Sequence, residues 1–270
     1  DPDGGRCLGS GGRAVTMNEQ DRQTDQGRRG FIGVAAGLTA AAVVPGVVLH
    51  TVAAQPRSEA VTDAVRWGLL IETSWCADGC TACVDACDHE NGLDLQTRPE
   101  SQSQADWDLQ KAVWIRKVKL QDNLTGRVTS LPLMCQHCEH PPCVDVCPTA
   151  ASFRRADGIV MVDRHTCIGC RYCMMACPYN ARSFIHENIE TKLTVAPRGK
   201  GCVESCNLCV HRRDNGETTT ACQDACTQGA IVFGDLKDPD SAVSQAMARY
   251  PNVQIRADLK LNTGVRYTDV

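Results

Sequence analysis

The sequence has no run of lysines and arginines, and its formal net charge is −4 with acidic and basic residues mixed along the chain. This pattern gives no indication of binding to nucleic acid or to an anionic membrane surface. It also lacks a nucleophile paired with a base, a phosphate-binding glycine loop and a dinucleotide fingerprint, so we expect no catalytic residue. Aromatic residues are scarce, at 4%, whereas eighteen of the 270 residues are cysteine. Cysteine is therefore the feature that the fold must explain first.

Sixteen of the cysteines fall into four modules of four. The modules are Cys76, Cys80, Cys83 and Cys87; Cys135, Cys138, Cys143 and Cys147; Cys167, Cys170, Cys173 and Cys177; and Cys206, Cys209, Cys222 and Cys226. Module three, followed by Pro178, has the complete spacing of a bacterial ferredoxin run. Module two is followed by Pro148, and module four carries a twelve-residue insertion before Cys222. Short β-type runs such as 67–71 and 158–162 adjoin the modules.

This spacing suits iron-sulfur chemistry. Three cysteines on a tight loop direct their sulfurs to three irons of one cluster, and thiolates are the soft ligands that such clusters require. The fourth cysteine lies a step further along, and we expect it to begin a short helix and to ligate the other cluster of a pair. The sequence therefore predicts four 4Fe-4S clusters on the sixteen cysteines, and it predicts that Cys7 and Cys202 are not ligands.

Two other uses of cysteine compete with this interpretation. A disulfide framework is natural in an exported protein, but such scaffolds are small and do not repeat a ferredoxin run. Structural zinc also uses paired cysteines, although four groups of four fit cubane clusters better. His137 and His140 flank Cys138, and we expect them to make hydrogen bonds or partner contacts rather than to ligate iron.

The N-terminal residues indicate export. Residues 1–16 are glycine-rich and read as vector-derived or upstream-translated sequence, with Met17 as a natural start. At 17–54, the pair Arg28-Arg29 precedes an apolar stretch and a small-residue cleavage site, the pattern of a twin-arginine signal peptide. An uncleaved membrane anchor is the alternative. We expect a periplasmic protein that is exported folded and associates with the membrane through its complex.

The motifs carry a resemblance that covers residues 65–240. Cys-Gln-His-Cys-Glu-His-Pro-Pro-Cys at 135–143, the ferredoxin run at 167–178 and Glu-Ser-Cys-Asn-Leu-Cys at 204–209 resemble the four-cluster ferredoxin subunits of membrane-bound respiratory oxidoreductases. The first spacing and the leader are similar to those of the periplasmic iron-sulfur subunit of the Dsr electron-transport complex. This resemblance implies an NrfD-type, quinone-interacting membrane subunit and a multihaem cytochrome c as partners, in dissimilatory sulfur metabolism.

The expected fold is α+β, with tandem ferredoxin-like halves and insertions at 88–130 and 178–205. In a two-cluster ferredoxin each run gives its last cysteine to the other cluster, so modules two and three should exchange Cys147 and Cys177. The resemblance implies the same exchange of Cys87 and Cys226 between modules one and four. Asp157-Gly158 predicts a hairpin turn. A C-terminal tail at 241–270 should start with a short helix that is capped by Asp240 or Ser241.

Three functions stay open at this point. The first is an electron-transfer subunit with no substrate of its own, and we prefer it because four clusters form a path for electrons. The second is the β subunit of a molybdopterin oxidoreductase such as polysulfide or tetrathionate reductase, which also conducts electrons and differs in its partner. The third is a cluster-based redox sensor.

Overall fold

The structure is a computed structural model that describes residues 61–191 and 193–270. The 1–16 segment, the twin-arginine segment at 17–54 and Cys7 lie outside the described residues. Within the described part, no helix has both the length and the apolar character needed to cross a bilayer. Helices and small sheets are both present there, which confirms the α+β class.

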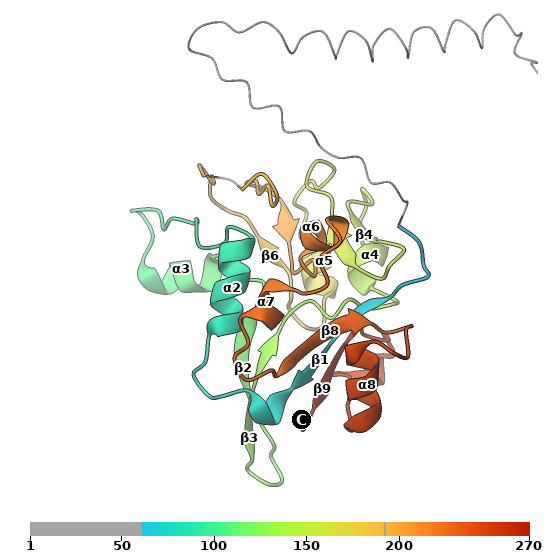
Figure 1. Cartoon of the computed structure of the whole chain (residues 1–270). Helices are drawn as coiled ribbons and strands as arrows, with labels where there is room; N and C mark the ends of the chain where they lie inside the picture. The colour runs from blue at the N-terminus through green and yellow to red at the C-terminus, as the bar shows by residue number, and fades with distance from the viewer. Residues whose placement is uncertain (1–60, 192) are drawn as a thin grey trace, which may run out of the picture. The chain divides into compact units, whose positions relative to one another are not determined.

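A three-stranded sheet forms the base of the fold (Figure 1). Its central strand β1 (Trp67–Glu72) pairs antiparallel with β8 (Ile231–Asp235) and parallel with β9 (Val265–Thr268). Helix α8 (Ala242–Arg249) packs against β8 and β1. Residues 69–71 of the predicted β-type run are all buried, as expected for a strand that is covered on both faces.

The C-terminal segment belongs to this sheet. Helix α8 begins as predicted, with the side chain of Ser241 accepting a hydrogen bond of 3.2 Å from the backbone N–H of Ser244. Strand β9 then places Tyr267 in the core, where its hydroxyl donates to the carbonyl of Pro132 and accepts from the side-chain amide of Gln136. The segment set apart in the sequence as a tail therefore ties the sheet to module two.

Two hairpins lie beside the sheet. The longer one joins β2 (Arg116–Gln121) to β3 (Val128–Leu133) and extends away from the sheet in Figure 1. The shorter one joins β4 (Ser152–Arg154) to β5 (Val160–Val162) and confirms the predicted turn. Gly158 in that turn has a φ of +89°, a backbone conformation that favours glycine.

A short helix runs between the third and fourth cysteines of every module. These helices are α2 (Ala82–Glu90), α4 (Pro142–Asp145), α5 (Tyr172–Ala176) and α7 (Ala221–Asp224). The expectation that the fourth cysteine begins the helix is wrong, because the third cysteine lies in the first turn and the fourth follows about one turn later. Only α2 continues past its fourth cysteine, Cys87.

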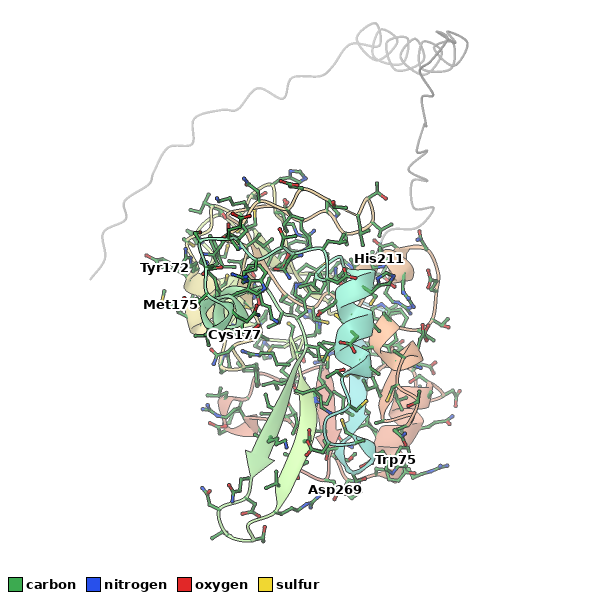
Figure 2. The ribbon with its side chains drawn as sticks, turned by 90° about the vertical axis from the view of Figure 1, so that its left-hand side faces the viewer. Trp75, Tyr172, Met175, Cys177, His211 and Asp269 are labelled. Carbon is green, nitrogen blue, oxygen red and sulfur yellow. The ribbon has the colours of Figure 1, made fainter. Side chains whose placement is uncertain are left out.

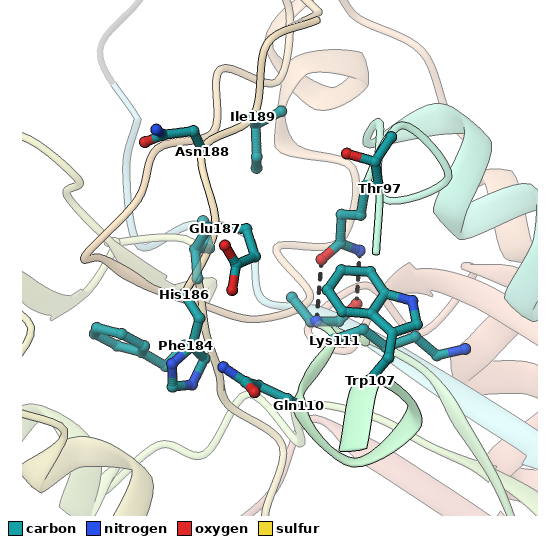
Figure 3. A pocket seen from close by; sticks show the side chains of 12 residues that line it. Thr97, Trp107, Gln110, Lys111, Phe184, His186, Glu187, Asn188 and Ile189 are labelled. Carbon is teal, nitrogen blue, oxygen red and sulfur yellow. Dashed lines mark hydrogen bonds between the residues drawn. The ribbon is translucent and has the colours of Figure 1, made fainter. Parts of the chain in front are cut away.

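The insertions dock against each other beside a small pocket (Figure 3). Trp107 on α3 (Gln104–Gln110) faces the segment 184–189 there, and the side-chain amide of Gln96 makes two hydrogen bonds of 3.0 Å with the backbone of Ala112. No cysteine lines this pocket. The remaining elements are η2 (Thr73–Trp75), β6 (Ser183–Phe184), β7 (Val203–Glu204), α6 (Val210–Asp214) and η3 (Ala257–Leu259).

The approach of β9 to β1 leaves no room for a side chain at Gly68. A Cβ there would lie 2.4 Å from the carbonyl oxygen of Gly264 and 2.5 Å from Leu236. Gly68→Ala should lower the free energy of unfolding by about 1–3 kcal/mol, because the strands must shift. Gly199→Ala is the control, since a Cβ at that position meets nothing within 4 Å. Equal thermal stability of the two variants would contradict the packing of β9 on β1.

Candidate iron-sulfur sites

The first site is a pocket that four thiols share. Its thiols are Cys76, Cys80, Cys83 and Cys226. Three of them belong to module one, and Cys226 follows α7 of module four. The ammonium of Lys117 on β2 lies 2.6 Å from the sulfur of Cys76, so it can donate a hydrogen bond to a thiolate there. Half-exposed Trp75 also lines the pocket.

The third site is a second pocket with the same organisation. Its thiols are Cys167, Cys170 and Cys173 of module three, together with Cys147 of module two. Cys170 is the one exposed thiol among the described cysteines, whereas Cys173 is buried on α5. This site therefore places one of its cysteines at the protein surface.

The second site is buried and combines three thiols of module two with Cys177 of module three. Burial raises the pKa of Cys135 and Cys138 to about 12, with the nearby thiols of Cys143 and Cys177 contributing. Thiols with so high a pKa are protonated at neutral pH. Binding of iron must therefore displace their protons, as it does at other buried thiolate sites.

The fourth site is also buried, and it combines module four with Cys87. Burial raises the pKa of Cys87 well above its usual range, and the neighbouring thiols of Cys206, Cys222 and Cys209 raise it further. No thiol of its own module appears among these neighbours. The structure thus brings Cys87 to module four and Cys226 to module one.

The four groups of thiols are those expected from the exchange between modules. Whether each thiol ligates iron stays a prediction. The described cysteines are all free of disulfide bonds. In the same part of the chain, no group of three or more His, Cys, Asp or Glu side chains is placed to hold a single metal ion.

The sites follow one another in a fixed order. Burial is the main cause of the raised pKa of three thiols, and in each case a thiol of another site raises that pKa further. Cys83 of the first site acts on Cys222 of the fourth, Cys135 of the second acts on Cys206 of the fourth, and Cys173 of the third acts on Cys143 of the second. The first site therefore neighbours the fourth, the fourth neighbours the second, and the second neighbours the third.

The fourth cysteine of each module accepts an N–H hydrogen bond from a residue four or five positions later. The donors in modules two, three and four are the backbone N–H groups of Ser152, Ala181 and Ala230, at 3.3–3.5 Å from sulfur. In module one the backbone N–H of Asn91 bonds to a helix carbonyl instead, because α2 continues past Cys87. The side-chain amide of Asn91 is the donor to the sulfur here, at 3.7 Å, and it also donates to the carbonyl of Cys87 at 3.0 Å.

Sequence reasoning missed both Asn91 and Lys117. The position of Asn91, four residues after Cys87, is a local signal that could have been compared with Ala181 and Ala230. Lys117 gives no such signal, since it reaches Cys76 only through the hairpin. His137, which we expected to make hydrogen bonds rather than to ligate iron, is buried and accepts a hydrogen bond of 3.1 Å from the backbone N–H of Val160. Burial lowers its pKa to about 3, so it is neutral.

The comparisons with known proteins agree with this geometry. The 4Fe-4S dicluster domain family matches residues 127–236. The Hdr-like menaquinol oxidoreductase iron-sulfur subunit 1 of Archaeoglobus fulgidus is 38% identical, over 85% of this chain and 94% of its own length. This chain belongs to the 4Fe-4S iron-sulfur subunits of respiratory oxidoreductases. The subunit is also 37% identical to the protein NrfC of Escherichia coli, over 73% of this chain and 78% of that protein.

A further relative is a subunit of a tetrathionate reductase. One tetrathionate reductase subunit of Salmonella typhimurium is 33% identical, over 84% of this chain and 80% of its own length. The resemblance to ferredoxin-type subunits and the 4Fe-4S cofactor are confirmed. The four-thiol groups provide the soft ligands that this cofactor requires. The iron-sulfur subunit therefore transfers electrons.

Asn91 supplies a test of the fourth site. Asn91→Leu removes the amide donor to Cys87, and reduction of a cluster at that site should become harder by about 1 kcal/mol, or about 40 mV for one electron. A potentiometric titration followed by EPR measures the shift, and one cluster alone should move. Asn252→Leu is the control, because the Asn252 amide donates to the carbonyls of Met247 and Tyr250. Equal potentials in both variants would contradict the contact.

Cys202 lies near the third site. The sequence predicts that it is not a ligand, and its thiol donates to the carbonyl of Arg164 and lies beside Cys167. We expect Cys202→Ser to keep about sixteen iron and sixteen sulfide per chain, as in the unaltered subunit. Cys206→Ser should lose iron. A loss of iron in Cys202→Ser, with none in Cys167→Ser, would make Cys202 a ligand.

Proposed function

We propose that the sixteen cysteines of the four sites ligate four 4Fe-4S clusters in two ferredoxin-like halves. One half contains the second and third sites, and the other contains the first and fourth. The grouping of the thiols supports this assignment. In each half two helices pack together, and each runs from a cysteine of one site toward a cysteine of the other. A 4Fe-4S cluster supplies one-electron transfer, and the chain holds the sulfurs and restricts access of water.

The order of the sites carries the functional proposal. The third site ends the series at exposed Cys170, beside the exposed side chains of Tyr172 and Met175. The first site forms the other end of the series, and Trp75 lines its pocket. Figure 2 shows Tyr172 and Met175 on one side of the protein and Trp75 on the other. Two terminal sites near the surface and two buried sites between them suit a subunit that relays electrons between two partners.

One partner, in this proposal, is an NrfD-type integral membrane subunit that exchanges electrons with quinone, and the other is a multihaem cytochrome c. The names of two relatives, a menaquinol oxidoreductase subunit and a menaquinone reductase subunit, support a quinone-linked role. The twin-arginine sequence supports a periplasmic location with membrane association through the complex. Resemblance to the Dsr iron-sulfur subunit supports dissimilatory sulfur metabolism.

A second candidate is the electron-transfer β subunit of a molybdopterin oxidoreductase. The similarity to the tetrathionate reductase subunit over 84% of this chain favours it. The two candidates share the cofactor and the relay, so they differ in the partner that binds at one end.

Affinity purification of the tagged subunit from native membranes separates these candidates. We expect an NrfD-type membrane subunit and a haem protein to co-purify. A molybdopterin subunit in their place would contradict the proposal and support the second candidate. The control carries Arg28→Lys and Arg29→Lys, which should keep the subunit in the cytoplasmic fraction and away from both partners. Normal export of this control would contradict the twin-arginine route.

A further inference from the structure

Arg182 is a buried arginine with no carboxylate partner among the described residues. The residue directly precedes β6 in the sequence, and only 5% of it is exposed. Within the described residues, none of its three guanidinium nitrogens has an oxygen or nitrogen partner. Arg198, which is buried to a similar degree, donates to the carboxylate of Glu204 at 3.0 Å. A buried guanidinium is costly unless an anion faces it.

Burial alone would lower the pKa of Arg182, but nearby thiols of two different sites raise it above its ordinary value. Cys143 and Cys135 belong to the second site, and Cys173 belongs to the third. The same three thiols each respond to the charge of Arg182 in return. The guanidinium therefore lies where these two sites meet, and it is placed to donate a hydrogen bond to Cys173.

A 4Fe-4S cluster with four thiolates is an anion, and reduction adds one negative charge to it. A fixed cation in a buried position interacts more strongly with that charge than a cation in water does. Net charge and hydrogen bonds to sulfur are among the factors that set the potential of such clusters. A cation near two sites also weakens the repulsion between them when both are reduced.

We propose that Arg182 is the shared counter-ion of the clusters at the second and third sites and raises the reduction potential of both. The proposal rests on the ligand assignment proposed above. Because clusters with a higher reduction potential are reduced first, electrons then favour the half of the subunit that contains the second and third sites. Lys117 has a different position, since it contacts Cys76 of the first site alone.

The test uses the full chain, purified without oxygen, in a potentiometric titration followed by EPR. Arg182→Met removes the charge and keeps much of the volume. We expect the equilibrium constant for reduction of the second and third clusters to fall by more than tenfold. This corresponds to a drop in reduction potential of more than about 59 mV for one electron. The first and fourth clusters should not shift. Cys138→Ser and Cys167→Ser identify the signals of the second and third sites.

Two controls separate charge from packing. Lys111→Gln removes a half-exposed lysine from the groove that Arg182 also lines, and it should leave all four potentials unchanged. Arg182→Lys keeps the charge, so its potentials should lie close to those of the unaltered chain. No shift in Arg182→Met at full iron content would overturn the proposal, and so would an equal shift of all four clusters.

Iron content covers the remaining outcomes. If Arg182→Met loses iron, Arg182→Lys decides: full iron with nearly unaltered potentials supports the counter-ion, and loss of iron there too would make Arg182 a packing residue and overturn it. Iron content of the unaltered chain near eight would instead refute the ligand assignment. The two failures are thus distinguishable, because iron content tests the ligands and potentials test Arg182.

Discussion

Thiols that are distant in the sequence must meet at each site, and the rest of the fold depends on this requirement. Cys226 reaches the pocket of module one because β8, which follows it, pairs with β1, which precedes Cys76. The same pairing brings Cys87 on α2 close to Cys222 on α7, since these two helices pack against each other.

The burial of the thiols links iron binding to the free energy of folding. Burial raises the pKa of Cys83 to about 11 and of Cys222 to about 12, so without iron these two thiols are neutral at pH 7. Iron binding exchanges those protons for metal bonds, and the binding free energy then contributes to folding. The N–H donors that follow each fourth cysteine fit this scheme, because they are already directed at the sulfur before any charge develops on it.

Local spacing predicted what local geometry controls. The ferredoxin run, the turn at Gly158 and the Ser241 cap depend on neighbours within a few residues, and the structure has the turn and the cap at the expected positions. The start of the module helices was misplaced by one turn, because the spacing of the last two cysteines fits either arrangement. Contacts of Lys117 and Arg182 with thiols could not be predicted from spacing, since they arise only after remote segments pack together. Pairing of β9 with β1 was missed for the same reason.

An experimental structure of the anaerobically purified protein, with iron located by anomalous scattering, tests the exchange most directly. The account predicts four iron clusters, with the sulfur of Cys226 bonded to the cluster of Cys76, Cys80 and Cys83. It also predicts the sulfur of Cys87 on the cluster of module four. Four sulfurs of one module around one cluster would contradict the exchange and the ferredoxin-like halves proposed from it.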